Sequence, residues 1–223
     1  MLLSGNITPE LIIANLLVLL VAMTIHEWAH NFVAWKMGDP EPKRLGRLTL
    51  NPFVHINWIG WLMFALIGFG ILGSAPISPY RMPYENRRWR WLAAVAAGPV
   101  SNLILAVIFA LAMRLALAAG LASSDSFFSS LIMTILQQGV IFNLILFFFN
   151  LIPLFPLDGW QIVLALLPPD LAYTWQKYQQ VSYYAFFGLI LLSFLRLPGI
   201  PNLLNVLVYQ PTIALAQFLV FGR

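Results

Sequence analysis

The sequence contains no cysteine and very little charge. The absence of cysteine from 223 residues excludes disulfide bonds and thiolate metal sites. Only 9% of the residues are charged and 61% are hydrophobic, whereas soluble domains carry about 25% charged and about 45–50% apolar residues. The polar stretches are too short to fold on their own. The composition therefore indicates one integral-membrane domain over residues 1–223.

Several other features are missing. The first ten residues hold no lysine, no arginine and no A-x-A-like site, so we expect no cleaved signal peptide. No internal repeat and no signal of oligomeric state is visible. The net charge of +4 and the pI near 9.6 would suit nucleic-acid binding, but the basic residues flank apolar runs, which is the pattern of membrane topology. We expect a lipid bilayer, and no nucleic acid, among the partners.

Long apolar runs are what the sequence has instead. A membrane-spanning helix needs about 20 mostly apolar residues. The first predicted helix has Thr8 as its N-cap and Pro9 at its first position. We predict an all-α polytopic membrane protein with helices at about 9–36, 89–119, 127–151, 182–197 and 203–221.

A further apolar run, Trp58–Leu72, has two interpretations. Its fifteen residues would make a helix of about 22 Å, shorter than the bilayer core of about 30 Å. Lysine and arginine collect on the cytoplasmic side, and the basic clusters before and after the run share a side only if the run re-enters. We predict a re-entrant segment and a short extended strand within residues 58–80, giving five spans, with a sixth full span as the alternative. The N-terminus is then expected outside and the C-terminus in the cytoplasm.

Two histidines and a glutamate interrupt the first apolar run. "HEWAH", residues 26–30, fits the pattern H-E-x-x-H. Residues i and i+4 share a helix face, so His26 and His30 can bind one metal ion with Glu27 beside it. Imidazole suits zinc, and a catalytic zinc takes three protein ligands and a water. Glu27 is the candidate general base toward that water; two buried histidines bonded to backbone carbonyls are the alternative.

A third ligand must come from the one remaining histidine, His55, or from the remaining acids. Most of the acids lie in polar segments, where a solvated carboxylate is expected, as for Asp39, Glu41 and Glu85. Asp158 differs because "NLIPLFPLDGWQIVLALL" is apolar on both sides, and its prolines and Gly159 unwind the backbone. An acid at such a break needs a partner. We predict Asp158 as a zinc ligand, with a turn-forming aspartate as the alternative.

Four stretches resemble the motifs of one known family. "HEWAH", "NLIPLFPLDGW" and "AAGPVSN" are similar to the signatures of site-2 proteases, zinc metalloproteases that cut inside membranes, and "GRLTLNPFVHI" resembles their compact bacterial branch. The resemblance covers about residues 25–161 and implies a catalytic core at about 9–161, followed by C-terminal helices at about 178–223. It implies one zinc per chain with the ligands His26, His30 and Asp158, Glu27 as the base, and Asn150 as a polar group beside the reacting carbonyl. An interhelical hydrogen bond is the alternative role for Asn150.

The resemblance also implies a substrate. It predicts a multi-pass protein of the bacterial inner membrane that cuts a transmembrane protein within or near the cytoplasmic end of a helix. The alternatives are a metal-ion or proton transporter and a protease-like protein that binds zinc without cutting. Transporters usually show paired halves, which this sequence lacks, and a protein that no longer cuts has no need of Glu27.

The remaining polar and aromatic residues receive structural roles. We expect Asn102 to tie helices together, Gly98 to let helix backbones approach, and His55 to be a loop histidine near the interface. Six tryptophans, Trp91 among them, are expected in the interfacial belt.

Overall fold

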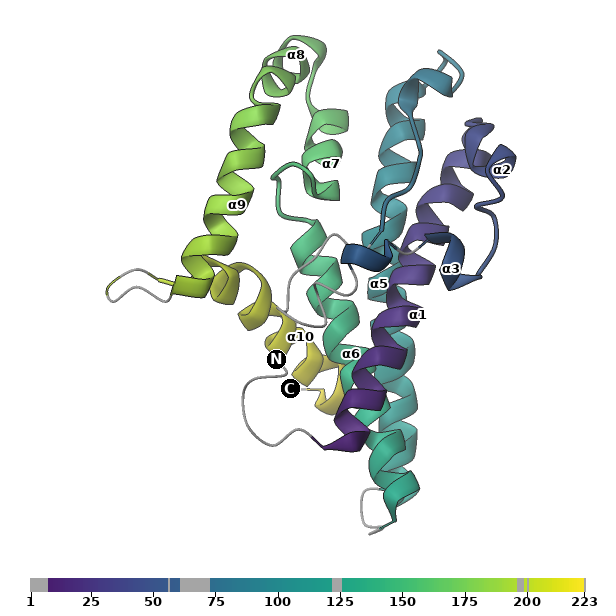
Figure 1. Ribbon diagram of the computed structural model, residues 1–223, viewed down its shortest axis with the longest axis vertical. Coiled ribbons are helices and arrows are strands. Elements are labelled where there is room, and N and C mark those ends of the chain that lie inside the picture. Colours follow the sequence, from purple (N-terminus) through teal and green to yellow (C-terminus); the bar gives the residue numbers. More distant parts are fainter. Residues whose placement is uncertain are drawn as a thin grey trace.

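The computed structural model describes residues 8–55, 57–60, 73–121, 126–195, 199 and 201–222 (Figure 1). Three of its helices are long and apolar enough to cross a membrane: α1 (Pro9–Lys36), α5 (Arg87–Ala118) and α6 (Phe127–Asn150). The shorter elements are α2 (Glu41–Arg44), α3 (Pro52–His55), η1 (Pro79–Arg81), α7 (Asp158–Leu166), α8 (Pro169–Lys177), α9 (Gln179–Leu195), η3 (Asn205–Tyr209) and α10 (Gln210–Phe221). The described residues form no sheet, so the all-α prediction is confirmed for them.

The helices α1, α5 and α6 lie side by side and form the body of the molecule (Figure 1). α1 begins where the sequence predicts, because the Thr8 hydroxyl accepts a hydrogen bond from the Leu11 N–H at 3.3 Å. Alanines line the contacts of these helices, and small side chains let helices in a membrane approach closely. The fully or almost fully buried ones are Ala14, Ala22, Ala34, Ala94, Ala106 and Ala110.

The chain breaks between α6 and α7. α6 ends at Asn150 and α7 begins at Asp158, so the predicted unwinding around the prolines is observed. A Cβ atom on Gly159 would lie 2.4 Å from the carbonyl oxygens of both Leu151 and Ile152. Only glycine therefore lets α7 start this close to the end of α6, and this packing fixes the position of Asp158.

The last helix ends on the side of the molecule where the first begins. The Arg114 side chain, near the end of α5, donates hydrogen bonds to the carbonyls of Val220 at 3.0 Å and Phe218 at 3.2 Å. The predicted placement of the N-terminus outside and the C-terminus in the cytoplasm is therefore wrong as a pair, because α1 begins and α10 ends on the same side of the bundle, away from the basic cluster around Arg87. The reason is that α10 continues the direction of α9 rather than turning back (Figure 1). Residues 61–72 lie outside the described residues, so the re-entrant segment and its alternative stay predictions.

Asp39 is buried rather than solvated, which corrects the expectation for this acid. Its side chain is 0% exposed. The Arg81 guanidinium donates to its two carboxylate oxygens at 2.7 and 2.9 Å, and the Ser78 N–H donates at 2.9 Å. Burial alone would raise the pKa of Asp39, but these hydrogen bonds, led by Arg81, hold it below its usual value. The carboxylate thus anchors the segment before η1 to the end of α1.

We expect Asp39→Asn to lower the free energy of unfolding by about 1–3 kcal/mol, because it leaves the donors of Arg81 and Ser78 incompletely paired. Thermal unfolding in detergent would measure the loss. Because the folded-state pKa of Asp39 is lowered, its contribution is present above the ordinary aspartate pKa of about 3.9 and disappears as the pH falls through the lowered value. Glu41→Gln is the matched control, since its partner Arg44 is largely exposed, and it should leave the melting temperature unchanged. Equal melting temperatures for both variants would contradict the role of Asp39 in anchoring the segment before η1 to the end of α1.

Candidate metal centre and active site

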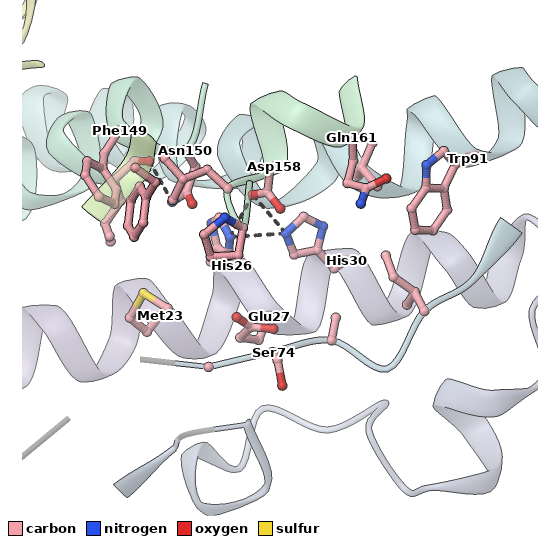
Figure 2. A pocket seen from close by; sticks show the side chains of 18 residues that line it. Met23, His26, Glu27, His30, Ser74, Trp91, Phe149, Asn150, Asp158 and Gln161 are labelled. Carbon is pink, nitrogen blue, oxygen red and sulfur yellow. Dashed lines mark hydrogen bonds and ion pairs between the residues drawn. The ribbon is translucent and has the colours of Figure 1, made fainter. Parts of the chain in front are cut away.

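The two histidines of α1 and the aspartate of α7 meet at one point. His26 and His30 are 3% and 4% exposed, and their Nε2 atoms lie 3.1 Å apart. Each Nε2 is 3.3 Å from Asp158 Oδ2. Figure 2 shows the three side chains converging from two helices. The structure therefore brings together the three residues predicted as ligands, although 128 residues separate His30 from Asp158.

The Nδ1 atoms of both imidazole rings donate hydrogen bonds to the protein. His26 Nδ1 donates to Asn102 Oδ1 at 2.6 Å, and His30 Nδ1 donates to the Ala94 carbonyl at 2.9 Å. With the proton on Nδ1, each Nε2 presents a lone pair to the other and to Asp158. Asp158 Oδ2 is itself buried with no hydrogen-bond partner in the described part of the chain. Three acceptor atoms that converge in this way would be satisfied by one bound cation.

Zinc fits this donor set. Two imidazole nitrogens and a carboxylate oxygen are ligands that zinc prefers, and three protein ligands leave the fourth position of a catalytic site open. Ligand atoms of a tetrahedral zinc with bonds of about 2.0–2.1 Å lie about 3.3 Å apart. The separations of 3.1 to 3.3 Å match that spacing.

Asn102 has a second role that sequence reasoning missed. Its amide donates to the Ala22 carbonyl at 3.3 Å and to Asn143 Oδ1 at 2.9 Å, so it ties α5 to α1 and α6 as expected. Its oxygen also accepts from His26 and thereby sets the tautomer and orientation of that ring. The available signal was its place on α5, one helical turn after Gly98 and on the same face.

Gly98 makes room for the imidazole rings. A Cβ atom at this position would lie 2.2 Å from His30 Nε2 and 2.7 Å from His26 Nε2. The sequence interpretation, that Gly98 serves the approach of helix backbones, therefore misses its main contact. Neither nitrogen can shift without leaving the point where it meets Asp158.

Gly98→Ala should lower the zinc content of the purified protein at least about tenfold, because displacing orienting contacts of a ligand costs about 10–100-fold in metal affinity. Alanine is otherwise the better helix former by about 1 kcal/mol, so the loss would report the clash and not a weakened helix. Elemental analysis after dialysis measures it. The matched control is Gly188→Ala in α9, where an added Cβ meets nothing within 4 Å. Full zinc content in Gly98→Ala would refute the assignment.

Glu27 lies beside the three predicted ligands in the same cavity. The cavity has a volume of about 360 Å³ and is lined by all three predicted ligands, Glu27 and Asn150. The Glu27 side chain is buried, and its Oε2 has no hydrogen-bond partner in the described structure. A Cβ at Gly73 would lie 2.7 Å from Glu27 Oε1, and Figure 2 shows the carboxylate between α1 and Ser74. This carboxylate is free to accept a proton inside the cavity.

Two other residues considered for the site from the sequence, Asn150 and His55, differ in whether they line the cavity. Asn150 lines the cavity, and its amide donates to the Leu146 carbonyl at 2.9 Å, which is a bond within α6 and not between helices. His55 does not line the cavity. It is 2% exposed, its Nε2 donates to the Thr49 carbonyl at 2.7 Å, and burial lowers its pKa. His55 therefore holds its own loop together as a neutral ring.

Comparison with known proteins identifies the family. The sequence model of Peptidase family M50 matches residues 14–193. The chain belongs to peptidase family M50. This M50 peptidase is 39% identical over 194 residues to a Bacillus subtilis protein named "Putative zinc metalloprotease YwhC", a match that covers 84% of this chain and 81% of that protein.

Shorter matches reach mycobacterial proteins. The M50 peptidase is 33% identical over 94 residues to "Putative zinc metalloprotease Rip2" of Mycolicibacterium smegmatis, covering 40% of this chain and 35% of that one. It is 34% identical over 101 residues to the protein of the same name from Mycobacterium tuberculosis H37Rv, covering 43% and 38%. No solved structure matches the chain significantly.

The family settles the class of protein. The resemblance to site-2 proteases is confirmed, and the chain is a zinc-dependent metalloprotease with helices that suit a membrane. The transporter interpretation has no support from these matches. The family match does not by itself assign the individual ligands, which rest on the geometry above.

Proposed function

We propose that this M50 peptidase is an intramembrane endopeptidase that cuts a substrate transmembrane helix within or near its cytoplasmic end. The observation that carries the proposal is the convergence of His26, His30 and Asp158 on a buried cavity beside α1, a helix long enough to span. His26 precedes Lys36 by ten residues, which places it about 15 Å from the basic end of α1. The reaction would therefore take place at membrane depth.

Five of the residues that line the cavity have a role in this proposal. His26, His30 and Asp158 hold the zinc, which when bound lowers the pKa of water to about 7 and polarises a carbonyl. Glu27 accepts a proton from the attacking water at its carboxylate and returns it to the leaving amine nitrogen. The second amide hydrogen of Asn150 is available to the oxyanion that develops on the carbonyl oxygen.

The substrate helix must unwind before it can be cut. A helix holds its peptide carbonyls in internal hydrogen bonds. The non-helical residues 74–78 pass Glu27 on the cavity side opposite Asp158 (Figure 2), where they offer an edge to which an unwound stretch could add as a strand. Glycine or proline near the scissile bond should therefore speed cleavage, and a run of leucine should slow it.

The experiment that tests the function uses the purified protein in vesicles and a transmembrane test peptide. Cleavage should stop with a chelator and return with zinc, and a Gly-Pro version should be cut faster than an all-Leu version. Zinc binding without any product would indicate a scaffold that does not cut. Zinc or proton flux without a product would indicate a transporter. Equal rates for both peptides would contradict the unwinding step.

The return of the chain to one end of the bundle supports the re-entrant arrangement. Arg90 Nη1 donates to the Met37 carbonyl at 3.2 Å, and Asp39 pairs with Arg81. Both ends of the segment between α1 and α5 therefore lie together, whereas a single full span would separate them.

We expect Thr49→Cys and Glu85→Cys, introduced singly into this cysteine-free chain, to be labelled from the same membrane face by an impermeant maleimide. Thr49 precedes residues 58–72 in the sequence and Glu85 follows them. Both positions lie outside the long helices. Labelling after permeabilisation controls for access. Labelling of the two positions from opposite faces would establish a full span at residues 58–72.

A further inference from the structure

A second cavity adjoins the catalytic one. It has a volume of about 920 Å³ and lies where the start of α5, η1, α7 and α8 come together, with Tyr80, Trp89 and Tyr173 among its walls. Ile77, Trp91 and Gln161 line both cavities. Figure 2 shows Trp91 and Gln161 beyond His30, at the end of the catalytic cavity away from Met23. The two spaces therefore adjoin at these three shared residues, which we call the neck.

The neck contains an unused hydrogen-bond donor. Trp91 is 9% exposed, so its expected place in the interfacial belt is wrong. Its indole Nε1 is buried and has no hydrogen-bond partner within the described part of the chain. Burying a donor unpaired is costly, and such groups in native structures call for an explanation. An acceptor brought by a ligand would satisfy this N–H.

The chemistry of the neck suits an extended polypeptide. Ile77 belongs to the non-helical segment 74–78 and offers an apolar wall, Trp91 offers a donor, and the Gln161 amide offers both a donor and an acceptor. A peptide backbone presents carbonyls and N–H groups at regular spacing, so it can be bound here whatever its side chains are. A chain that left the catalytic cavity toward the end of the bundle where α5 begins would come next to these three residues.

An anionic lipid headgroup fits the second cavity less well. Arg88 directs its guanidinium at the carbonyls of Ala165 and Leu166 at the end of α7. Arg87 donates to the Met82 carbonyl at 3.3 Å and stacks over Tyr84. Both arginines are thus already turned toward the protein.

We propose that the neck and the second cavity bind the flank of the substrate that leaves the membrane next to the scissile bond, as an extended chain whose backbone bonds to Trp91 and Gln161. This proposal rests on the proposed function, since it assumes a membrane-embedded substrate. The second cavity is then a subsite that favours substrates with an unfolded flank over those whose chain ends at the membrane.

Two test substrates would measure the effect. They share one transmembrane sequence, and one carries a flank of about ten residues, which span about 33 Å when extended, whereas the other stops after two. The wild type should cut the long-flank substrate with a higher kcat/KM. Trp91→Phe, which keeps an aromatic ring and removes the N–H, and Tyr173→Ala should each lower the ratio of the two kcat/KM values about threefold to tenfold. Tyr178→Ala is the control, because it is similarly exposed near the same helix and does not line the cavity.

A crosslink would test binding without cleavage. In Glu27→Gln protein carrying Tyr173→Cys, a single cysteine in the long flank should form a disulfide, and Tyr178→Cys should not. A crosslink that forms only with anionic lipid present, and equally with the short substrate, would assign the cavity to lipid and overturn the proposal. The proposal would also be overturned if Trp91→Phe and Tyr173→Ala lowered kcat/KM equally for both substrates. A wild type that showed no preference for the long-flank substrate would overturn it as well. Failure of the proposed function looks different, because the wild type would then cut neither substrate in a zinc-dependent way.

Discussion

Glu27→Gln should abolish cleavage of a transmembrane test peptide and leave the bound zinc unchanged. General acid–base catalysis contributes about 10²–10⁴-fold to a rate, and Glu27 is the acid that lines the cavity without belonging to the converging ligand set. Glutamine has the same shape, so it fits the space beside Gly73, where a Cβ atom would leave too little room. It cannot accept the proton of the attacking water. Single-turnover cleavage together with elemental analysis on the same preparation would measure both effects.

Glu10→Gln provides the control for this variant. Glu10 lies on the same helix but in its first turn, about 24 Å from His26, so its loss should change neither zinc content nor rate. Substantial cleavage by Glu27→Gln, at more than about a tenth of the wild-type rate, would show that another group removes the proton.

Asp158→Ala should remove most of the bound zinc and all measurable activity. Asp158 is the proposed ligand from the second helix, and its Oδ2 lies 3.3 Å from both imidazole nitrogens. Without Asp158, the two histidines would supply only two of the four ligands of a tetrahedral zinc ion. Zinc that binds only the folded chain also stabilises it, so the melting temperature of the wild type should rise with zinc and that of the variant should not.

The neighbouring acid Asp170 supplies the comparison. It lies in the first turn of α8 and is exposed, so Asp170→Ala should keep the wild-type zinc content and the zinc-dependent rise in melting temperature. Zinc bound by Asp158→Ala at one equivalent per chain would remove this residue from the ligand set.

The parts of the site that follow from local sequence were predictable. The spacing of His26 and His30 fixes their shared helix face, and the apolar surroundings of Asp158 mark it as an acid that needs a partner. The bounds of α1 follow from Thr8, Pro9 and the length of the apolar run. Each of these inferences uses only neighbours along the chain.

What the sequence could not provide depends on contacts between distant segments. Asp39 reads as a solvated loop acid until Arg81 is placed beside it. Asn102 reads as a helix tie until His26 is found at its oxygen, and Trp91 reads as a belt residue until α1 and α7 cover it. The direction of α10 was predicted wrongly for a similar reason, because 182–197 and 203–221 read as two opposed spans until Arg114 is placed beside Val220.

The distribution of the proposed ligands over α1 and α7 sets an order of events during synthesis. His30 emerges 128 residues before Asp158, which at about 5–20 residues per second corresponds to about 6–26 s. Throughout that interval the nascent chain holds the two histidines and Glu27 but lacks Asp158. If the proposed ligand set is right, the chain can assemble a zinc site, and with it the capacity to cut, only after the start of α7 has been made. A fold that placed all ligands on one helix would lack this delay.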